Sequence, residues 1–398
     1  MLFSSIFFIC IFLPVTLILY YVVPGKLKNA VLLLLSLVFY AWGEPVYVLL
    51  MIFSIVFNYM AGIQMDDLTS LREEKRRKGI FIFTVAVNIG MLGFFKYFDF
   101  TLSNLNMIFG TDIPLKNIAL PIGISFYTFQ ILSYVIDVYR KKVPVQKNII
   151  DFGAYITMFP QLIAGPIVRY DDIRRQLKHR TINFDKLADG TAWFIKGLSK
   201  KVLLANNIGM LFDEIRAVDV PERAVFTTWL MVIAYTFQIY FDFSGYSDMA
   251  VGLGKMLGFD FLQNFDHPYM SVSATEFWRR WHISLGTWFR EYLYIPMGGN
   301  RHGELRKMRN LFVSMLIIGL WHGAGWTFII WGGLHGILLM INHAWRKTGI
   351  ALPKICNWGM TFLCVMICWV FFRAGSVREA LLVLGQLVDW QTVADASR

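Results

Sequence analysis

Long runs of apolar residues recur along this chain, and they constrain its fold more than any other feature of the sequence. A helix needs about 20 mostly apolar residues to cross the hydrocarbon core of a bilayer. About ten runs come near that length, which predicts an all-α, polytopic membrane protein with one integral domain, residues 1–398. The expected spans cover residues 3–23, 29–43, 45–64, 79–99, 117–138, 188–212, 223–243, 308–321, 325–345 and 357–373.

The composition supports a membrane protein and argues against other classes. Hydrophobic residues make up 56% of the chain and charged residues 16%, whereas soluble domains carry about 45–50% apolar and about 25% charged residues. The net charge of +11 comes from basic residues in short loops, so we assign it to topology and anionic lipid headgroups rather than to nucleic acid. The four cysteines show no spacing typical of disulfides or metal sites.

Basic residues gather in alternate loops, such as Arg72–Lys78, Arg140–Lys147 and Arg169–Arg180. The positive-inside rule places these loops in the cytoplasm and the N-terminus outside it. The first apolar run lacks a basic leader and a cleavage site, so we interpret it as a spanning helix rather than a removed signal. We therefore expect a multi-pass protein of the cell membrane.

One apolar stretch, Phe152–Val168, is interrupted by Pro160, Gly165 and Pro166. Such a segment is too broken for a regular span, and irregular backbone at membrane depth must face protein or a water-filled cavity. We expect a re-entrant or half-membrane segment here.

Polar residues interrupt the apolar pattern between Tyr240 and Arg309. Asp242 and Asp248 would be costly in hydrocarbon, so they are expected to face a cavity or, more plainly, to cap helices or pair with a nearby arginine. Between Thr275 and Tyr294, aromatic residues recur at three- and four-residue steps. This spacing predicts one amphipathic helix that either lies flat in the interface or lines an internal funnel, with His282 in its aromatic face.

A second histidine, His322, lies near the middle of a long apolar run. An ionisable side chain at that depth is a functional hypothesis by default, and histidine suits the removal of a hydroxyl proton near neutral pH. The neighbouring Gly323 and Gly325 allow close backbone approach or a break in the helix, which would open a path to the imidazole. The structural alternative is an interhelical hydrogen bond to a serine or threonine.

The remaining histidines carry weaker signals. We interpret His335 as structural or supporting and His343 as an interfacial anchor, and we assign no role to His179, His267 and His302. The chain also lacks a phosphate-binding loop, a nucleophile elbow and an HExxH motif, which argues against an ATP-driven pump and against those hydrolases.

Two segments together are specific enough to indicate a family: EFWRRWHISLGTWFREYLYIPMGGNR at residues 276–301 and WHGAGWTFIIWGGLHG at residues 321–336. With LPIGISFYTFQILSYVIDVYR, FPQLIAGPIVRY and YFDFSGYSDMAVGLGKMLGF, they resemble the membrane-bound O-acyltransferase (MBOAT) superfamily. Within it, the resemblance is greatest to the bacterial alginate O-acetyltransferase (AlgI) type. Members of that type usually continue beyond the segment WVFFRA with further spans, so we expect this chain to be a shortened form.

The resemblance implies a ring of transmembrane helices around a central funnel, with short amphipathic helices on the cytoplasmic side. It implies that His322 is the catalytic residue and that His282 is the family's second, less universal histidine. The implied reaction moves an acetyl group from a cytoplasmic thioester, on coenzyme A or a carrier protein, across the membrane for O-acetylation of an exported polysaccharide. No bound cofactor is implied, and a separate extracytoplasmic acyltransferase is the implied partner.

Around the two histidines we expect residues that bind substrate, with the arginines attracting the phosphates of the donor. They are Trp281, Arg279, Arg280, Arg290, Asn300, Arg301, Trp321 and Asp242. Three alternatives remain open: D-alanyl transfer to teichoic acid, a transporter or flippase for a lipid-linked glycan, and a scaffold that anchors a secreted transferase. The sequence shows no repeated halves of the kind that transporters tend to have.

Overall fold

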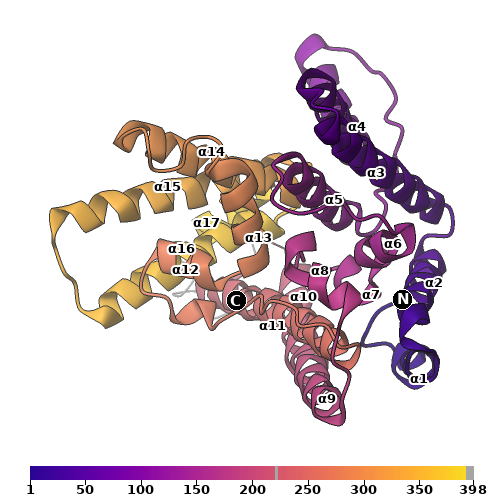
Figure 1. The fold of residues 1–398 in the computed structure, drawn as a ribbon. Coiled ribbons are helices and arrows are strands. Elements are labelled where there is room, and N and C mark those ends of the chain that lie inside the picture. Colours follow the sequence, from indigo (N-terminus) through magenta and orange to yellow (C-terminus); the bar gives the residue numbers. More distant parts are fainter. Residues whose placement is uncertain (220–222, 391–398) are drawn as a thin grey trace. The chain divides into compact units, whose positions relative to one another are not determined.

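The computed structural model describes residues 1–219 and 223–390, and the chain divides into two compact units. Unit 1 comprises Met1–Lys196 with Tyr246–Leu262, and unit 2 comprises Gly197–Gly245 with Gln263–Arg398. Every regular element among the described residues is a helix (Figure 1), which confirms the predicted all-α class. Two helices, α9 and α11, belong partly to each unit, and the single integral domain stays a prediction.

Unit 1 holds the N-terminal helices. They are η1 (Phe8–Phe12), α1 (Leu13–Val22), η2 (Gly25–Leu27), α2 (Lys28–Gly43), α3 (Tyr47–Ser70), α4 (Glu74–Phe109), α5 (Ile124–Tyr139), α6 (Ile149–Thr157), α7 (Phe159–Leu162), α8 (Tyr170–Lys178) and most of α9 (Phe184–Ser199).

Unit 2 holds the C-terminal helices and the segments with the two candidate histidines. Its helices are η3 (Lys200–Ala205), α10 (Asn206–Ala217), the first part of α11 (Val225–Met256), η5 (Pro268–Met270), α12 (Ala274–Arg280), α13 (Ile283–Phe289), η6 (Arg290–Tyr294), α14 (Glu304–His322), α15 (Trp326–Thr348), α16 (Lys354–Arg373) and α17 (Val377–Gln386).

Five helical segments in the described part of the chain are long and apolar enough to cross a membrane. They are Gly25–Gly43, Tyr47–Ser70, Glu74–Phe109, Trp326–Thr348 and Lys354–Arg373. The other predicted spans also contain helices, but these are shorter or less apolar; α5, for example, has 16 residues and begins only at Ile124. The fold is therefore that of a polytopic membrane protein, and the ring around a central funnel stays a prediction.

The apolar surface of α4 shows why these helices need lipid. Only 17% of its most apolar window is buried within the protein, and Ile82, Phe83 and Ile89 are more than half exposed. Soluble proteins rarely expose continuous apolar faces of this kind. Lipid chains would cover this face without any cost in unsatisfied polar groups, because the backbone of a helix is bonded internally.

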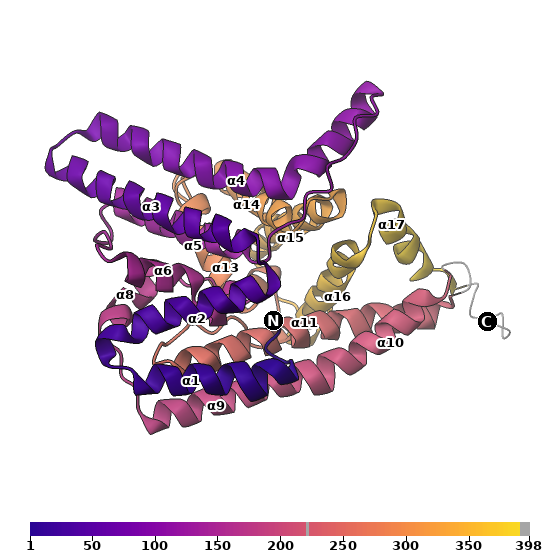
Figure 2. The ribbon, with the colours of Figure 1, turned by 90° about the vertical axis from the view of Figure 1, so that its right-hand side faces the viewer.

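Helices α3 and α4 lie side by side in both views (Figures 1 and 2). Their contact includes a buried pair of amides: the Asn58 side chain donates to Asn88 at 3.1 Å, and Asn88 donates back at 2.7 Å. Polar side chains in a lipid-covered helix pair find partners in the neighbouring helix, because lipid offers none. This exchange fixes the register of α3 against α4.

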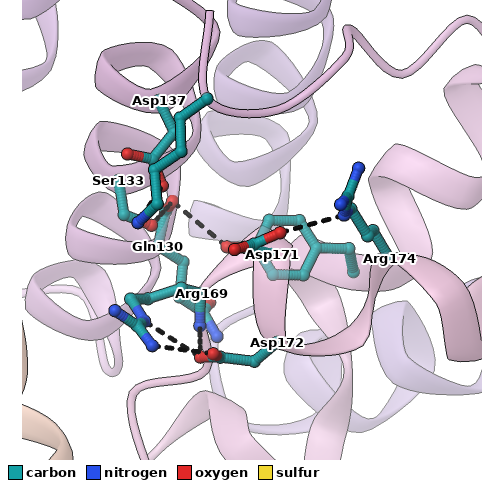
Figure 3. Close-up of polar contacts among 9 residues, drawn as sticks. Gln130, Ser133, Asp137, Arg169, Asp171, Asp172 and Arg174 are labelled. Atoms are coloured by element: carbon teal, nitrogen blue, oxygen red, sulfur yellow. Dashed lines mark hydrogen bonds and ion pairs between the residues drawn. The ribbon is translucent and has the colours of Figure 1, made fainter. Parts of the chain in front are cut away.

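The interrupted segment Phe152–Val168 is indeed broken, as predicted: α6 ends at Thr157 and α7 begins at Phe159. It is buried inside unit 1, where the Tyr155 hydroxyl lies 3.2 Å from the carbonyl oxygens of both Gln130 and Val168. Figure 3 shows polar side chains of α5 and of the start of α8 in this unit, among them Arg169, which binds the Asp172 carboxylate at 2.8 and 3.1 Å. The irregular backbone is thus satisfied by protein, as its burial requires.

Two glycines let α14 and α15 approach closely in unit 2. A Cβ added at Gly319 would lie 3.1 Å from the Cα of Gly332, and a Cβ at either position would collide with a backbone carbonyl of the facing helix. Small residues at a helix contact replace side-chain packing by backbone packing, which is a common arrangement in membranes. The close contact holds the C-terminal end of α14 against the N-terminal end of α15.

Candidate active site

The predicted helix over Thr275–Tyr294 is wrong, because the chain breaks at Trp281 and His282. His282 has a left-handed backbone with φ of +47°, which is uncommon outside glycine. The helix breaks here because backbone groups that would bond within a continuous helix bond instead to an earlier segment of the chain. The Ile283 amide donates to the Asn264 carbonyl at 2.9 Å, and the Arg280 carbonyl accepts from Asp266 at 3.0 Å.

Asn264 also fixes the tautomer of His282. Its side-chain oxygen accepts from the Ser284 amide at 3.1 Å and from the Ser284 hydroxyl at 3.0 Å, so it acts as an acceptor. The same oxygen lies 3.1 Å from His282 Nδ1, which must therefore carry the proton. The lone pair of His282 is consequently on Nε2, and this atom has no hydrogen-bond partner among the described residues.

The surroundings of His282 keep it uncharged. The side chain is 1% exposed, and its ring lies 4.7 Å from the ring of Phe243. Burial lowers the pKa of His282 to about 3, because an apolar pocket disfavours the imidazolium ion. A neutral imidazole with a free lone pair is the form that can accept a proton.

His322 is the last residue of α14, and its side chain is half-buried. The helix ends there because Gly323 and Gly325 adopt extended backbones before α15 begins at Trp326, which confirms the predicted break. The His322 ring lies in an aromatic box, with ring centres 5.1 Å from Trp331 and 5.2 Å from Phe372. The imidazole is therefore at a helix end rather than in the middle of a continuous span.

Trp321 connects the two histidines. Its ring centre lies 4.9 Å from that of His322 and 6.3 Å from that of His282. Both imidazoles thus border one buried indole, although they come from segments forty residues apart. The structure thus brings together the two candidate histidines and one of the expected substrate-binding residues, Trp321.

A cleft of about 750 Å³ lies in unit 2 beside these residues. Three of the predicted substrate-binding residues line it: Arg279, Arg290 and Asn300. Two further basic residues, Lys307 and Arg346, line the same cleft and were missed by the sequence analysis. The sequence offered little indication of this role, because both residues lie in the terminal turns of helices, where basic residues are common. Only the packing of α14 on α15 brings them to the same cleft.

The cleft follows one face of α14. Its lining residues Lys307, Leu311, Ser314 and Ile318 recur at three- and four-residue steps, and the eleven steps from Lys307 to Ile318 extend about 16 Å along a helix axis. The cleft thus extends along α14 from the basic residue Lys307 to Ile318, one helical turn before His322. Neither His322 nor His282 is among its lining residues, but Ile283 and Trp321 are their direct chain neighbours, and Ile283 lines the cleft.

Comparison with known proteins decides the family. The sequence model described as "MBOAT, membrane-bound O-acyltransferase family" matches residues 141–374, which include both histidines and the cleft. The chain belongs to the membrane-bound O-acyltransferase family. The predicted resemblance and the predicted enzyme class, a membrane O-acyltransferase, are therefore confirmed.

Relatives of the chain include O-acetyltransferases that are similar over nearly its whole length and a transferase that is similar over part of it. A probable alginate O-acetylase from Pseudomonas aeruginosa is 48% identical over 96% of this chain and 73% of its own length. A peptidoglycan O-acetyltransferase from Helicobacter pylori is 38% identical over 99% of this chain and 81% of its own length. A teichoic acid D-alanyltransferase from Streptococcus thermophilus is 29% identical over 58% of this chain and 59% of its own length.

Other predicted site residues of this family member lie outside the cleft. Arg280 pairs with Glu276 at 2.8 Å on the same helix. Asp242 pairs with Lys201, so its partner is a lysine rather than the arginine that the sequence suggested. Trp281 is 3% exposed and packs on Trp369 with ring centres 4.9 Å apart.

Arg301 and Asp248 were also named in the sequence analysis, and neither lines the cleft. Arg301 is exposed in the loop after η6 and does not line the cleft. Asp248, which is 8% exposed, lies 4.0 Å from the amine of Lys196 within unit 1. These residues give no direct support to a substrate-binding role.

Two of the remaining histidines make contacts within unit 2, and the roles expected for them stay predictions. His335 is buried, and its Nδ1 accepts from the Trp278 indole at 3.2 Å. His343 lies near the end of α15, where its Nε2 contacts the Glu304 carboxylate at 2.8 Å. Within residues 1–219 and 223–390, no three His, Cys, Asp or Glu side chains gather in a way that could hold a metal ion.

Proposed function

We propose that the protein transfers an acetyl group from a cytoplasmic thioester to a hydroxyl group, for O-acetylation of an exported or cell-wall polysaccharide. The observation that carries this proposal is the cleft, which leads from basic residues to within one turn of His322. The names of the relatives, alginate O-acetylases and a peptidoglycan O-acetyltransferase, support acetyl as the group and polysaccharide as the acceptor. The D-alanyltransferase alternative receives less support, because those relatives are 27–29% identical over a smaller part of the chain.

The donor in this proposal is acetyl coenzyme A or an acetylated carrier protein. Both carry phosphate, and Arg279, Arg290, Lys307 and Arg346 surround the cleft into which such a donor would reach. Guanidinium groups bind phosphate through paired, charge-assisted hydrogen bonds. The part of the cleft near Leu311 and Ile318 is uncharged. It suits the acyl-bearing arm of the donor, whose phosphates would stay beside the basic residues.

In the proposed reaction, the His322 imidazole removes the proton of the acceptor hydroxyl as its oxygen attacks the thioester carbonyl. The carbon–sulfur bond then breaks, and the imidazolium returns its proton to the departing thiolate. General base assistance of this kind contributes about 10²–10⁴-fold to a rate. The neutral His282, on the other side of Trp321, orients the reacting groups or assists in the proton transfer. The close positioning of both substrates accelerates the reaction further.

The proposal includes a place in the cell. The protein would lie in the cell membrane with the basic cleft on the cytoplasmic side and the N-terminus outside the cytoplasm. Its partners would be membrane lipids, the acetyl donor, the polysaccharide and a separate extracytoplasmic acyltransferase.

The test is the His322→Ala variant, expressed in cells that lack the native gene, with O-acetyl groups on the exported polymer measured by mass spectrometry. We expect loss of at least about 10²-fold of the acetylation, with the amount of protein in the membrane unchanged. His179→Ala is the matched control, since His179 is exposed and has no assigned role. Normal acetylation in the His322→Ala cells would end the proposal.

A further inference from the structure

Unit 1 contains a pair of basic residues, Lys28 and Arg180, that share one aromatic ring. The Lys28 ammonium lies 4.9 Å from the centre of the Tyr20 ring, and the Arg180 guanidinium lies 5.4 Å from it. The two residues come from different parts of the chain, the start of α2 and the segment directly after α8, and their charges repel each other. This basic pair includes none of the residues proposed for acyl transfer.

Neutral groups hold the Arg180 guanidinium in place. It donates to the Tyr20 hydroxyl at 2.6 Å and to the Asn29 side-chain oxygen at 2.7 Å. Its longer contacts, at 3.3 and 3.4 Å, are to backbone carbonyls at the end of α8, and Nη2 makes no hydrogen bond within the described residues. These partners fix the guanidinium against α1 and α2, but they do not neutralise its charge.

The Lys28 ammonium also lacks an acidic partner in the described part of the chain. It lies over the ring faces of Tyr20 and Tyr21, at 4.9 and 5.4 Å. The carboxylate that this network reaches, Asp151, accepts from the Asn29 amide at 2.7 Å rather than from the ammonium. Helix α2 begins at Lys28 with no acidic residue in its first turn, so a helix N-terminus adds to the attraction for an anion.

The basic pair lies at the end of a segment that can span the membrane. Lys28 is in the first turns of the apolar segment Gly25–Gly43, and α1 lies beside α2 (Figures 1 and 2). On α1, the side chains of Val15, Ile18 and Val22 are between 47% and 79% exposed. Their three- and four-residue steps place them on one face of the helix. This face, the α1 strip, is an apolar surface that leads away from the basic pair.

We propose that Lys28 and Arg180 bind the phosphate of one anionic phospholipid, whose acyl chains lie along the α1 strip. The phosphate would supply the negative charge that both cations lack and an acceptor for Arg180 Nη2. Tyr20 and Tyr21 suit the headgroup level, where such rings are common. The positive-inside rule places both segments on the cytoplasmic side, so the lipid would lie in that leaflet.

The excess of positive charge also selects the class of headgroup. A choline or amine on the phosphate would bring a third positive group to a site that already holds two. A phospholipid with a net negative charge, such as phosphatidylglycerol, avoids that repulsion. We therefore expect the site to discriminate between lipids that have the same phosphate and the same acyl chains.

The experiment uses the purified full chain in a neutral detergent and two probes, phosphatidylglycerol and phosphatidylcholine with identical acyl chains. Native mass spectrometry counts the lipid molecules that each protein retains. We expect one phosphatidylglycerol to bind at least about fivefold more tightly than phosphatidylcholine, which is about the contribution of one basic residue near a headgroup. Equal retention of the two lipids would overturn the proposal.

Charge variants locate the site. Lys28→Gln should weaken phosphatidylglycerol binding about fivefold, whereas Lys28→Arg, which keeps the charge, should bind it as the parent chain does. Lys26→Gln is the matched control, since Lys26 is exposed two residues earlier, and it should change binding less than about twofold. Equal losses in the two glutamine variants would indicate a diffuse attraction to the membrane surface and overturn the site.

Two further arms separate binding from folding and a lipid from a free anion. Phosphatidylglycerol should raise the unfolding temperature of the parent chain and of Lys26→Gln more than that of Lys28→Gln. Equal stabilisation of all three chains would show that the lipid binds elsewhere. Inorganic phosphate in excess should not displace the lipid, because it has no acyl chains to cover the α1 strip. Displacement by phosphate would replace the lipid by a free anion, and either result would overturn the inference.

Discussion

At the scale of single residues, two histidines border one tryptophan but have different environments. His282 is enclosed, has its tautomer fixed by Asn264 and keeps an unpaired Nε2 among the described residues. His322 is half-buried at a helix end within an aromatic box. The accessible imidazole suits the base that meets substrate, and the enclosed one suits a supporting role.

The enclosed histidine makes stability depend on pH. Burial lowers the pKa of folded His282 to about 3, whereas an unfolded histidine titrates near pH 6.5. Below pH 6.5 the unfolded chain binds more protons, so the stabilisation present above that pH is lost as the pH falls toward the folded pKa. The loss from this group is up to about 1.4 kcal/mol per pH unit.

We therefore expect His282→Gln to have a shallower dependence of stability on pH between 4.5 and 6.5 than the parent chain. Thermal unfolding in detergent at a series of pH values would measure it, with the two chains compared at equal detergent and salt. Glutamine can still donate to Asn264, so the comparison isolates the titration. Parallel stability curves for the two chains would show that the imidazole is not held neutral.

At the scale of elements, the sequence predicted some features and not others, for physical reasons. The break at His322 was predictable, because Gly323 and Gly325 are local signals. The break at His282 was not, because it depends on hydrogen bonds that Asn264, eighteen residues earlier, accepts. Aromatic periodicity alone therefore suggested one helix where the structure has two.

The position of His322 depends on the close contact between α14 and α15. Gly332→Ala would place a methyl group against the Met315 carbonyl and 3.1 Å from the Cα of Gly319. Overpacking of this kind destabilises by about 1–3 kcal/mol, and we expect lower thermal stability together with lower acetyl transfer.

Gly333→Ala is the matched control for this prediction. The nearest atom to its added methyl group is a Leu316 side-chain carbon at 3.5 Å, which is an ordinary contact. The control should retain stability and activity. If Gly332→Ala is as stable and active as Gly333→Ala, the tight helix contact does not control the site.

At the scale of the whole molecule, the apolar helices, the cleft and the family assignment agree on a membrane acyltransferase. Hydropathy was sufficient to predict helices such as α3, α4 and α16, because their apolar runs are long. It was not sufficient to predict the cleft, because Lys307 and Arg346 come to line one cleft only through the packing of α14 on α15. The pairing of Asp242 with Lys201 was likewise hidden, since the two residues are 41 positions apart.

The charge of the cleft leads to a kinetic prediction. Arg346→Gln should raise the KM for the acetyl thioester about threefold to tenfold, with the loss growing smaller at high salt. The effect should fall on KM rather than kcat, because phosphate contacts far from the reacting carbonyl are equally strong in ground and transition states. Initial rates in proteoliposomes would measure both constants.

Arg306→Gln controls for the loss of a positive charge, since Arg306 is exposed on α14 and does not line the cleft. We expect its KM to match that of the parent chain. An equal rise in both variants would indicate a general effect of charge on the membrane surface rather than donor binding in the cleft.

The central claim is that the His322 imidazole can be reached from the cleft that is proposed to bind the donor. The most direct measurement is modification by diethyl pyrocarbonate, which reacts with neutral imidazole, followed residue by residue with mass spectrometry, with and without a non-hydrolysable thioether analogue of acetyl coenzyme A. The exposed His267 and the buried His335 serve as internal standards for full and minimal reaction. We predict that His322 reacts at neutral pH and that the analogue protects it while His267 stays reactive; an unreactive His322, or one that a saturating analogue leaves unprotected, would contradict the account.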